Sequence, residues 1–177
     1  MKNFCVFLVF VFFVPCFAFS QTDQYQSLLN RGEELAKKGD YDGAIAQYTQ
    51  AIRLNPDDAK AYFLRGAFYI EFKKDLDRAL PDLNQVIRLN PSFSAGYTYR
   101  GSIYVQKGNY ERALADLNQA IKLDPNNAQA YANRCLANLG IRNIDGCIDD
   151  LYKALELDPE NELARNTEAA LLKMMQN

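Results

Sequence analysis

Residues 94–127 read SAGYTYRGSIYVQKGNYERALADLNQAIKLDPNN, and most of the chain repeats the pattern of this stretch. The stretch ends in an apolar run followed by Asp124 and a proline. Such a proline returns every 34 or 35 residues, at Pro56, Pro91, Pro125 and Pro159. Two further series keep the same spacing: Arg31, Arg65, Arg100 and Arg134, and Ala44, Ala79, Ala113 and Cys147. Three series with one period of about 34 residues predict a stacked array of helical repeats.

Each repeat is predicted to hold two helices. In the first helix, Tyr97, Gly101 and Tyr104 stand at i, i+4 and i+7, which is the spacing of one helical face. A short turn follows, in which Asn109 is expected to cap the second helix, as Asp40 does in the first repeat. The Asn-Pro or Asp-Pro pair ends the second helix, because a residue before proline is driven out of the helical region.

This pattern resembles the tetratricopeptide repeat, through the set Tyr97, Gly101, Tyr104, Gly108, Tyr110, Ala113, Leu117, Ala120 and Pro125 and its counterparts in the other repeats. The resemblance implies an all-α fold, a right-handed superhelical solenoid whose concave groove binds a peptide or protein. It implies no reaction. Four repeats are expected at residues 25–58, 59–93, 94–127 and 128–161. Residues 162–177 are expected to form a capping helix, whose apolar side would be Leu163, Ala170, Leu171 and Met174.

Two repeats depart from the pattern. The second carries one extra residue, expected in the turn at residues 73–76, and Pro81 early in its second helix favours a late helix start or a kink. The fourth has Asn138 where an aromatic residue is usual. We therefore expect irregular groove spacing between the second and third repeats.

The resemblance also assigns candidate partner-binding residues on the first helix of each repeat. In the second to fourth repeats they are Phe63, Ile70, Thr98, Ser102, Val105, Gln129, Leu136 and Leu139. Apolar side chains dominate the groove positions, so binding is expected to depend weakly on salt. Family members that bind acidic C-terminal chaperone peptides use Lys, Asn and Arg at positions that here hold Leu29, Glu33, Leu64, Ala95 and Tyr99. That clamp is absent.

The arginine series allows two interpretations, an anion-binding stripe or a set of ion pairs. An acidic residue recurs on the second helix, at Asp82, Asp116 and Asp150, with Gln47 in the first repeat. Matched opposite charges favour Arg–carboxylate pairs within each repeat, and a neutral Arg31–Gln47 pair in the first. The repeated tyrosines are expected to fill the core rather than a binding site: Tyr62, Tyr69, Tyr97, Tyr104 and Tyr131.

The composition argues against catalysis and against nucleic acid. The 177 residues include 20 Lys and Arg, 22 Asp and Glu and no His, for a net charge of −2. Without histidine, Ser-His-Asp and Cys-His mechanisms are excluded. The acidic balance provides no basic surface for nucleic acid. We expect no enzyme activity, no cofactor or metal and no small-molecule substrate.

The first 20 residues have the character of a secretory signal peptide. Lys2 precedes an apolar run at residues 4–19, and Ala18 and Ser20 are small residues at −3 and −1 of a cleavage before Gln21. Cleavage would place the mature protein in the periplasm or outside the cell.

Two alternatives remain for this segment. A retained segment would make the protein an envelope-anchored assembly factor in contact with a membrane, although Pro15 interrupts a run shorter than the ~20 residues of a span. Lipidation of Cys16 is disfavoured because Pro15 occupies the place of a small residue.

The resemblance finally implies that Cys135 and Cys147 face each other. They occupy two positions that are small in the other repeats, where the helices of the family approach most closely. In an exported protein a Cys135–Cys147 disulfide is expected. The alternative is two free buried thiols, as in a reducing compartment.

Overall fold

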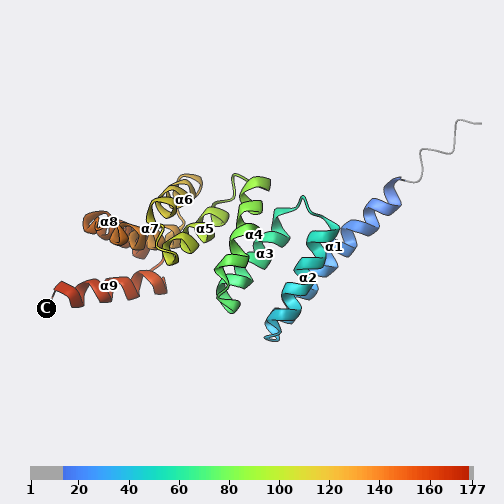
Figure 1. The fold of residues 1–177 in the computed structure, drawn as a ribbon, viewed down its shortest axis with the longest axis horizontal. Helices are drawn as coiled ribbons and strands as arrows, with labels where there is room; N and C mark the ends of the chain where they lie inside the picture. Colours follow the sequence, from blue (N-terminus) through green and yellow to red (C-terminus); the bar gives the residue numbers. More distant parts are fainter. Residues whose placement is uncertain (1–13, 176–177) are drawn as a thin grey trace, which may run out of the picture. The chain divides into compact units, whose positions relative to one another are not determined.

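The structure, a computed structural model, describes residues 14–175 (Figure 1). Every regular element in this range is a helix, as the sequence predicts. Most of the expected signal segment, residues 1–20, lies outside the described range. The chain divides into two compact units, residues 1–61 and residues 62–177.

The first unit contains one complete helix pair. Helix α1 (Val14–Lys37) packs against α2 (Tyr41–Leu54), and Asp40 caps α2 by accepting a 2.9 Å hydrogen bond from the Gly43 amide. The buried side chains between the helices include Leu29 and Tyr48. A third helix, α3 (Ala59–Phe68), begins in this unit and continues into the second.

The second unit repeats the same pairing. Its elements are η1 (Tyr69–Lys73), α4 (Leu76–Leu89), α5 (Ser94–Gln106), α6 (Tyr110–Leu123), α7 (Ala128–Gly140), α8 (Ile144–Leu157) and α9 (Glu162–Met175). Helix α5 packs on α6 and α7 on α8, with α6 against α7 joining the two pairs. Small and branched side chains fill three successive core clusters, centred on Leu83, Leu117 and Leu151. The expected tyrosines are half-buried against these cores, as Tyr97, Tyr104 and Tyr131 show.

The helix boundaries follow the predicted caps. Asn109 accepts a hydrogen bond from the backbone amide of Arg112, which confirms it as the cap of α6. At the other end, α6 stops at Leu123, and Asp124 turns to an extended φ of −140° before the proline. A capped start therefore begins each second helix, and proline fixes its end.

The extra residue of the second repeat lies within a helix rather than in a turn. It produces a π-helical turn, η1, so that the Asp75 amide reaches back six residues to the Tyr69 carbonyl at 2.9 Å. In the third repeat the equivalent bond, Asn109 to Tyr104, spans five residues. The insertion is absorbed by widening one turn.

Pro81 does not delay the start of its helix, which was one of the two effects expected of it. Helix α4 begins at Leu76, directly after its cap Asp75, which accepts from the Arg78 amide at 3.0 Å. The cap secures the first turn, so the missing proline amide falls inside an established helix.

The capping helix uses only part of the face that was predicted. Leu163 and Leu171 pack against the last core, together with the fully buried Ala164. Ala170 is exposed and Met174 is 73% exposed, so these two residues do not cover the last repeat. The buried stripe runs through Ala164, Thr167 and Leu171 at i, i+3 and i+7, which excludes both from the interface.

Candidate functional site

A pocket of about 490 Å³ lies in the second unit. It is lined by residues of η1, α5, α7 and α9: Ile70, Glu71, Thr98, Tyr99, Ser102, Val105, Gln106, Gln129, Asn133, Leu136 and Leu163. Side chains from three successive repeats and the capping helix thus converge on one cavity.

Six of the eight residues predicted to bind a partner line this pocket. They are Ile70, Thr98, Ser102, Val105, Gln129 and Leu136. Phe63 and Leu139 lie outside its lining. The Phe63 ring packs edge-on against Tyr99, with ring centroids 5.3 Å apart, and Leu139 packs on the last core cluster.

One set of groove positions belongs mainly to the core. The fifth residue of a repeat is 0% exposed at Leu29, 3% at Thr98 and 1% at Ala132. The Thr98 hydroxyl is occupied, since it donates to the Ser94 carbonyl and accepts from the Asn127 side chain at 3.0 Å. Thr98 therefore supports the pocket wall and offers little contact area to a partner.

Sequence reasoning missed the polar edge of the pocket. The Tyr99 hydroxyl donates a 2.7 Å hydrogen bond to Oε1 of the exposed Glu71, 28 residues away. Burial, and then this bond and the charge of Glu71, raise the pKa of Tyr99, so the phenol remains a neutral donor. Of the described residues that line the pocket, Glu71 alone carries a charge. The sequence clue to Glu71 was its place beside the inserted residue.

Amide side chains provide the remaining polar groups. Asn133 is 4% exposed and donates to the Gln129 carbonyl at 2.8 Å, which holds its amide in the pocket wall. Gln129 in turn accepts a 3.3 Å bond from Asn161, the residue that caps the start of α9. The capping helix is thereby tied to the pocket that it helps to line.

The arginine series forms ion pairs, as predicted. Arg100 meets Asp116 through two parallel bonds of 2.7 Å, from Nε and Nη2 to the two carboxylate oxygens. Arg65 and Arg134 make the corresponding pairs with Asp82 and Asp150. The hydrogen bonds that each arginine donates to its aspartate raise the pKa of the guanidinium above its ordinary value. None of these arginines lines the pocket.

Two asparagines that the sequence did not single out join neighbouring repeats. Nη1 of Arg100 donates to Asn84 of the preceding repeat at 2.9 Å, and Arg134 donates to Asn118 at 2.8 Å. Each of these arginines therefore connects its own repeat to the one before it.

The first repeat departs from this arrangement. Among the described residues, Arg31 makes no hydrogen bond to Gln47, so the predicted neutral pair is wrong. A glutamine amide lacks the charge and the two equivalent oxygens that align a guanidinium.

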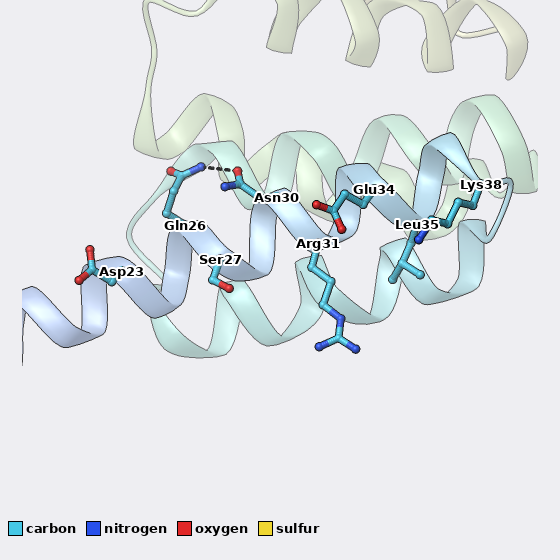
Figure 2. Close-up of a pocket in the computed structure, with 8 residues that line it drawn as sticks. All are labelled: Asp23, Gln26, Ser27, Asn30, Arg31, Glu34, Leu35 and Lys38. Carbon is cyan, nitrogen blue, oxygen red and sulfur yellow. Dashed lines mark hydrogen bonds between the residues drawn. The ribbon is translucent and has the colours of Figure 1, made fainter.

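Arg31 instead lines a hollow of about 750 Å³ along α1 in the first unit (Figure 2). Seven of the eight residues that line it belong to α1, and the eighth, Lys38, directly follows this helix. Gln26 donates to Asn30 at 2.9 Å. Ser27 and Glu34 occupy the positions that hold alanine in α7. The hollow is a mostly polar surface of mixed charge, in which Leu35 is the one apolar lining residue among those that the structure describes.

The fourth repeat contains the two cysteines. Cys135 of α7 and Cys147 of α8 are fully buried, and their sulfur atoms lie at disulfide distance. Their Cα atoms are 3.8 Å apart, closer than the ~4.4–6.8 Å that is usual for a disulfide.

Asn138, the residue that replaces an aromatic side chain, has a structural role nearby. Its amide donates to Asp150 at 3.0 Å and accepts from Asn143 at 3.2 Å. It therefore completes the hydrogen bonding of the Arg134–Asp150 pair.

The described residues contain neither a membrane-spanning helix nor a metal-binding cluster. No helix within residues 14–175 has the length and apolar character of a membrane span. The same range contains no group of three or more Cys, Asp or Glu side chains placed to hold a metal ion.

Comparison with known proteins links these features to one repeat family. A family model described as TPR repeat matches residues 32–71 and 101–140, and one described as tetratricopeptide repeat matches residues 59–93. Together the matches cover more than half of the chain.

Solved structures show the same fold. MamA (residues 41 to the end) from Desulfovibrio magneticus RS-1 is 20% identical, with a TM-score of 0.71 over 87% of this chain and 94% of that one. The first TPR of Spaghetti (RPAP3), bound to the HSP90 peptide SRMEEVD, is 26% identical, with a TM-score of 0.64 over 67% and 94%. The TPR domain of Arabidopsis OM64 is 24% identical, with a TM-score of 0.63 over 67% and 98%.

Proposed function

The chain belongs to the tetratricopeptide repeat family, and we propose on this basis that it is a non-catalytic scaffold that binds a peptide or protein segment in the pocket of its second unit. One observation carries the proposal. Six positions chosen from the sequence as partner-binding come together in one cavity with apolar walls. Apolar side chains in such a cavity serve as anchors for a bound segment.

The solved relatives support a protein partner in general terms. The first TPR of Spaghetti (RPAP3) holds an HSP90 peptide. Its acidic sequence differs from what the present pocket suits, because the described lining contains no lysine or arginine. We therefore propose a segment of another composition.

A peptide selection tests the proposed function. The full chain would be panned against a phage-displayed library of random peptides, and the selected peptides titrated against wild type, Val105→Ala and Leu136→Ala. Loss of one pocket anchor should weaken binding by about tenfold, since truncating a contact residue commonly costs more than 1 kcal/mol.

Leu172→Ala provides the matched control. Leu172 is 54% exposed on α9 and lies outside the pocket lining, so its removal should leave binding unchanged. Thermal melts of all three variants would separate lost contact from lost fold. Peptides that bind every variant equally well would refute the pocket as the binding site.

We also propose that the scaffold works outside the cytoplasm, after removal of residues 1–20. The support is the sequence of that segment, with its basic start, apolar run and small residues before Gln21. The mass of the protein recovered from the producing cells tests this proposal. A chain that begins at Gln21 is expected, whereas one that retains Met1 and fractionates with membranes would favour the envelope-anchored assembly factor.

Export would also make a Cys135–Cys147 disulfide the expected state of the fourth repeat. The burial of both residues and their placement on facing helices support it. Non-reducing peptide mapping of the exported protein should find one cross-linked pair, and two free thiols per mature chain would disprove the bond.

A further inference from the structure

The pocket combines apolar walls with a single fixed carboxylate. Ile70, Val105, Leu136 and Leu163 supply the apolar surface. At the edge, Glu71 is exposed, and its Oε1 is held at 2.7 Å by the Tyr99 hydroxyl. The lining therefore presents one negative charge beside a cavity that takes an apolar side chain.

The position of this carboxylate is determined by the fold on two sides. Glu71 lies in the π-helical turn Tyr69–Lys73, which forms because the second repeat has one more residue than the third. Turns of this kind are frequent at functional sites. Tyr99 is itself positioned by Phe63, whose ring meets it edge-on.

Charge complementarity then selects the partner. An acidic segment would meet Glu71 with no cation in the described lining to offset the repulsion. A Lys or Arg side chain would pair with the carboxylate at the edge, where both groups keep contact with water and the desolvation cost is small. A neighbouring apolar residue would enter the cavity.

We propose that the pocket binds a segment in which a lysine or arginine stands next to an apolar residue, with the cation on Glu71 and the apolar side chain against Val105 and Leu136. This proposal rests on the proposed function and adds the chemical class of the partner. It also gives a role to the pocket residues that the sequence analysis missed. Glu71, held by Tyr99, pairs with the cation of the bound segment, while the predicted residues contact its apolar side chain.

The peptide selection described above tests this inference through its composition. Peptides that depend on Val105 and Leu136 should be enriched in Lys or Arg adjacent to Leu, Ile, Met or Phe. Fluorescein-labelled copies of the most enriched peptide would then be titrated against variants of the full chain. Glu71→Gln should weaken binding roughly two- to fivefold, the value of one exposed ion pair. Glu71→Lys should weaken it further and shift a repeated selection toward acidic peptides.

Glu111→Gln is the control for the change in net charge, because Glu111 is exposed in the same unit and lies outside the pocket lining. A second peptide, with each Lys or Arg replaced by Gln, should lose affinity for wild type and bind Glu71→Gln as well as it binds wild type. Tyr99→Phe removes the group that fixes the carboxylate and should reduce the preference for the basic peptide over its Gln version.

The outcomes separate the two proposals. Pocket-dependent peptides that are acidic or purely apolar, or that bind Glu71→Gln as tightly as wild type, would overturn the inference and leave the scaffold function in place. A selection without pocket-dependent peptides would overturn the scaffold function and the inference with it.

Discussion

At the scale of the residue, the Arg–Asp pairs are the most regular polar feature of the second unit. The guanidinium of Arg100 is held by both oxygens of Asp116 and also lies 5.9 Å from the Tyr97 ring centroid. The carboxylate side chain is only 9% exposed, so it depends on this arginine for its charge balance. Such a pair contributes mainly by avoiding an unpaired buried charge.

Replacing Arg100 with alanine should therefore lower stability without a selective loss of binding. We expect a loss of about 2–4 kcal/mol in the free energy of unfolding, somewhat less than for a fully buried pair because the arginine is partly exposed. Urea denaturation would measure it. Arg112→Ala is the control, since Arg112 is exposed and contacts the Tyr104 ring at 5.8 Å, a contact worth about 1 kcal/mol or less. If Arg100→Ala kept its stability and lost the selected peptides, the anion-stripe interpretation would replace the ion pair.

Tyr48 makes the first unit sensitive to high pH. Burial and the nearby Glu33 raise the pKa of Tyr48 from an ordinary 10 to about 12. The unfolded chain loses this proton near pH 10, whereas the folded chain retains it, so the contribution of Tyr48 is fully present below pH 10 and is lost as the pH rises toward 12. In urea titrations, Tyr48→Phe should show a shallower loss of stability over this range than wild type. Tyr152→Phe, at a position 71% exposed, is the control, and equal slopes in the two variants would contradict the assignment.

At the scale of the element, sequence periodicity was sufficient to place the helices. The end of α6 before Asp124 and its start after Asn109 follow from local rules of capping and proline geometry. The same rules placed the extra residue of the second repeat in the turn near Lys74, whereas it lies in the helix. The amino-acid composition of the segment is the same in either case, so it does not distinguish the two positions. The distinction depends on which arrangement keeps the Asp75 cap bonded to Tyr69.

The candidate site was predictable in its apolar part for the same reason. Val105 and Leu136 follow from their place in the repeat, whereas Glu71 contacts Tyr99 only because two repeats are stacked. A contact between residues 28 apart, such as that of Glu71 with Tyr99, cannot be predicted from a sequence pattern that repeats every 34 residues. Phe63 was predicted as a groove residue from its position in the repeat, and its ring packs edge-on against Tyr99, which lines the pocket.

Deleting Lys74 tests the function of the π-helical turn. The deletion gives the second repeat the length of the third and should replace η1 with an α-helical turn. Ile70 and Glu71 would then rotate relative to α5. Selected peptides should then bind at least several-fold more weakly, while circular dichroism shows unchanged helix content. Lys74→Gly keeps the length and removes the left-handed strain at φ 53°, so it should retain binding. Wild-type affinity in the deletion variant would show that the turn has no role in the site.

At the scale of the whole molecule, the two ends of the described chain differ in character. The outer face of α1 is polar and of mixed charge, whereas the pocket side of the second unit combines apolar walls with amides and one carboxylate. Partner binding is therefore expected in the second unit, with charge playing a minor part.

Binding of the selected peptides should accordingly respond weakly to salt. Raising the ionic strength from about 0.05 to 0.5 M screens one exposed ion pair and leaves the apolar contacts intact, so affinity should fall by no more than about fivefold. Fluorescence anisotropy would measure the titration in wild type and in Glu71→Gln, whose salt response should be flatter still. An affinity that collapses over this range would show that charges outside the pocket dominate binding.

The bonds from Arg100 to Asn84 and from Arg134 to Asn118 have a mechanical consequence. When a repeat protein is stretched, repeats that interact weakly with their neighbours unfold one at a time, because each interface between repeats breaks independently. Here the arginine that pairs with the aspartate of its own repeat also bonds an asparagine of the preceding repeat. Unfolding one repeat therefore removes a hydrogen bond from its neighbour. When the second unit is pulled from its two ends, it should unfold in one large extension step rather than in a series of small steps.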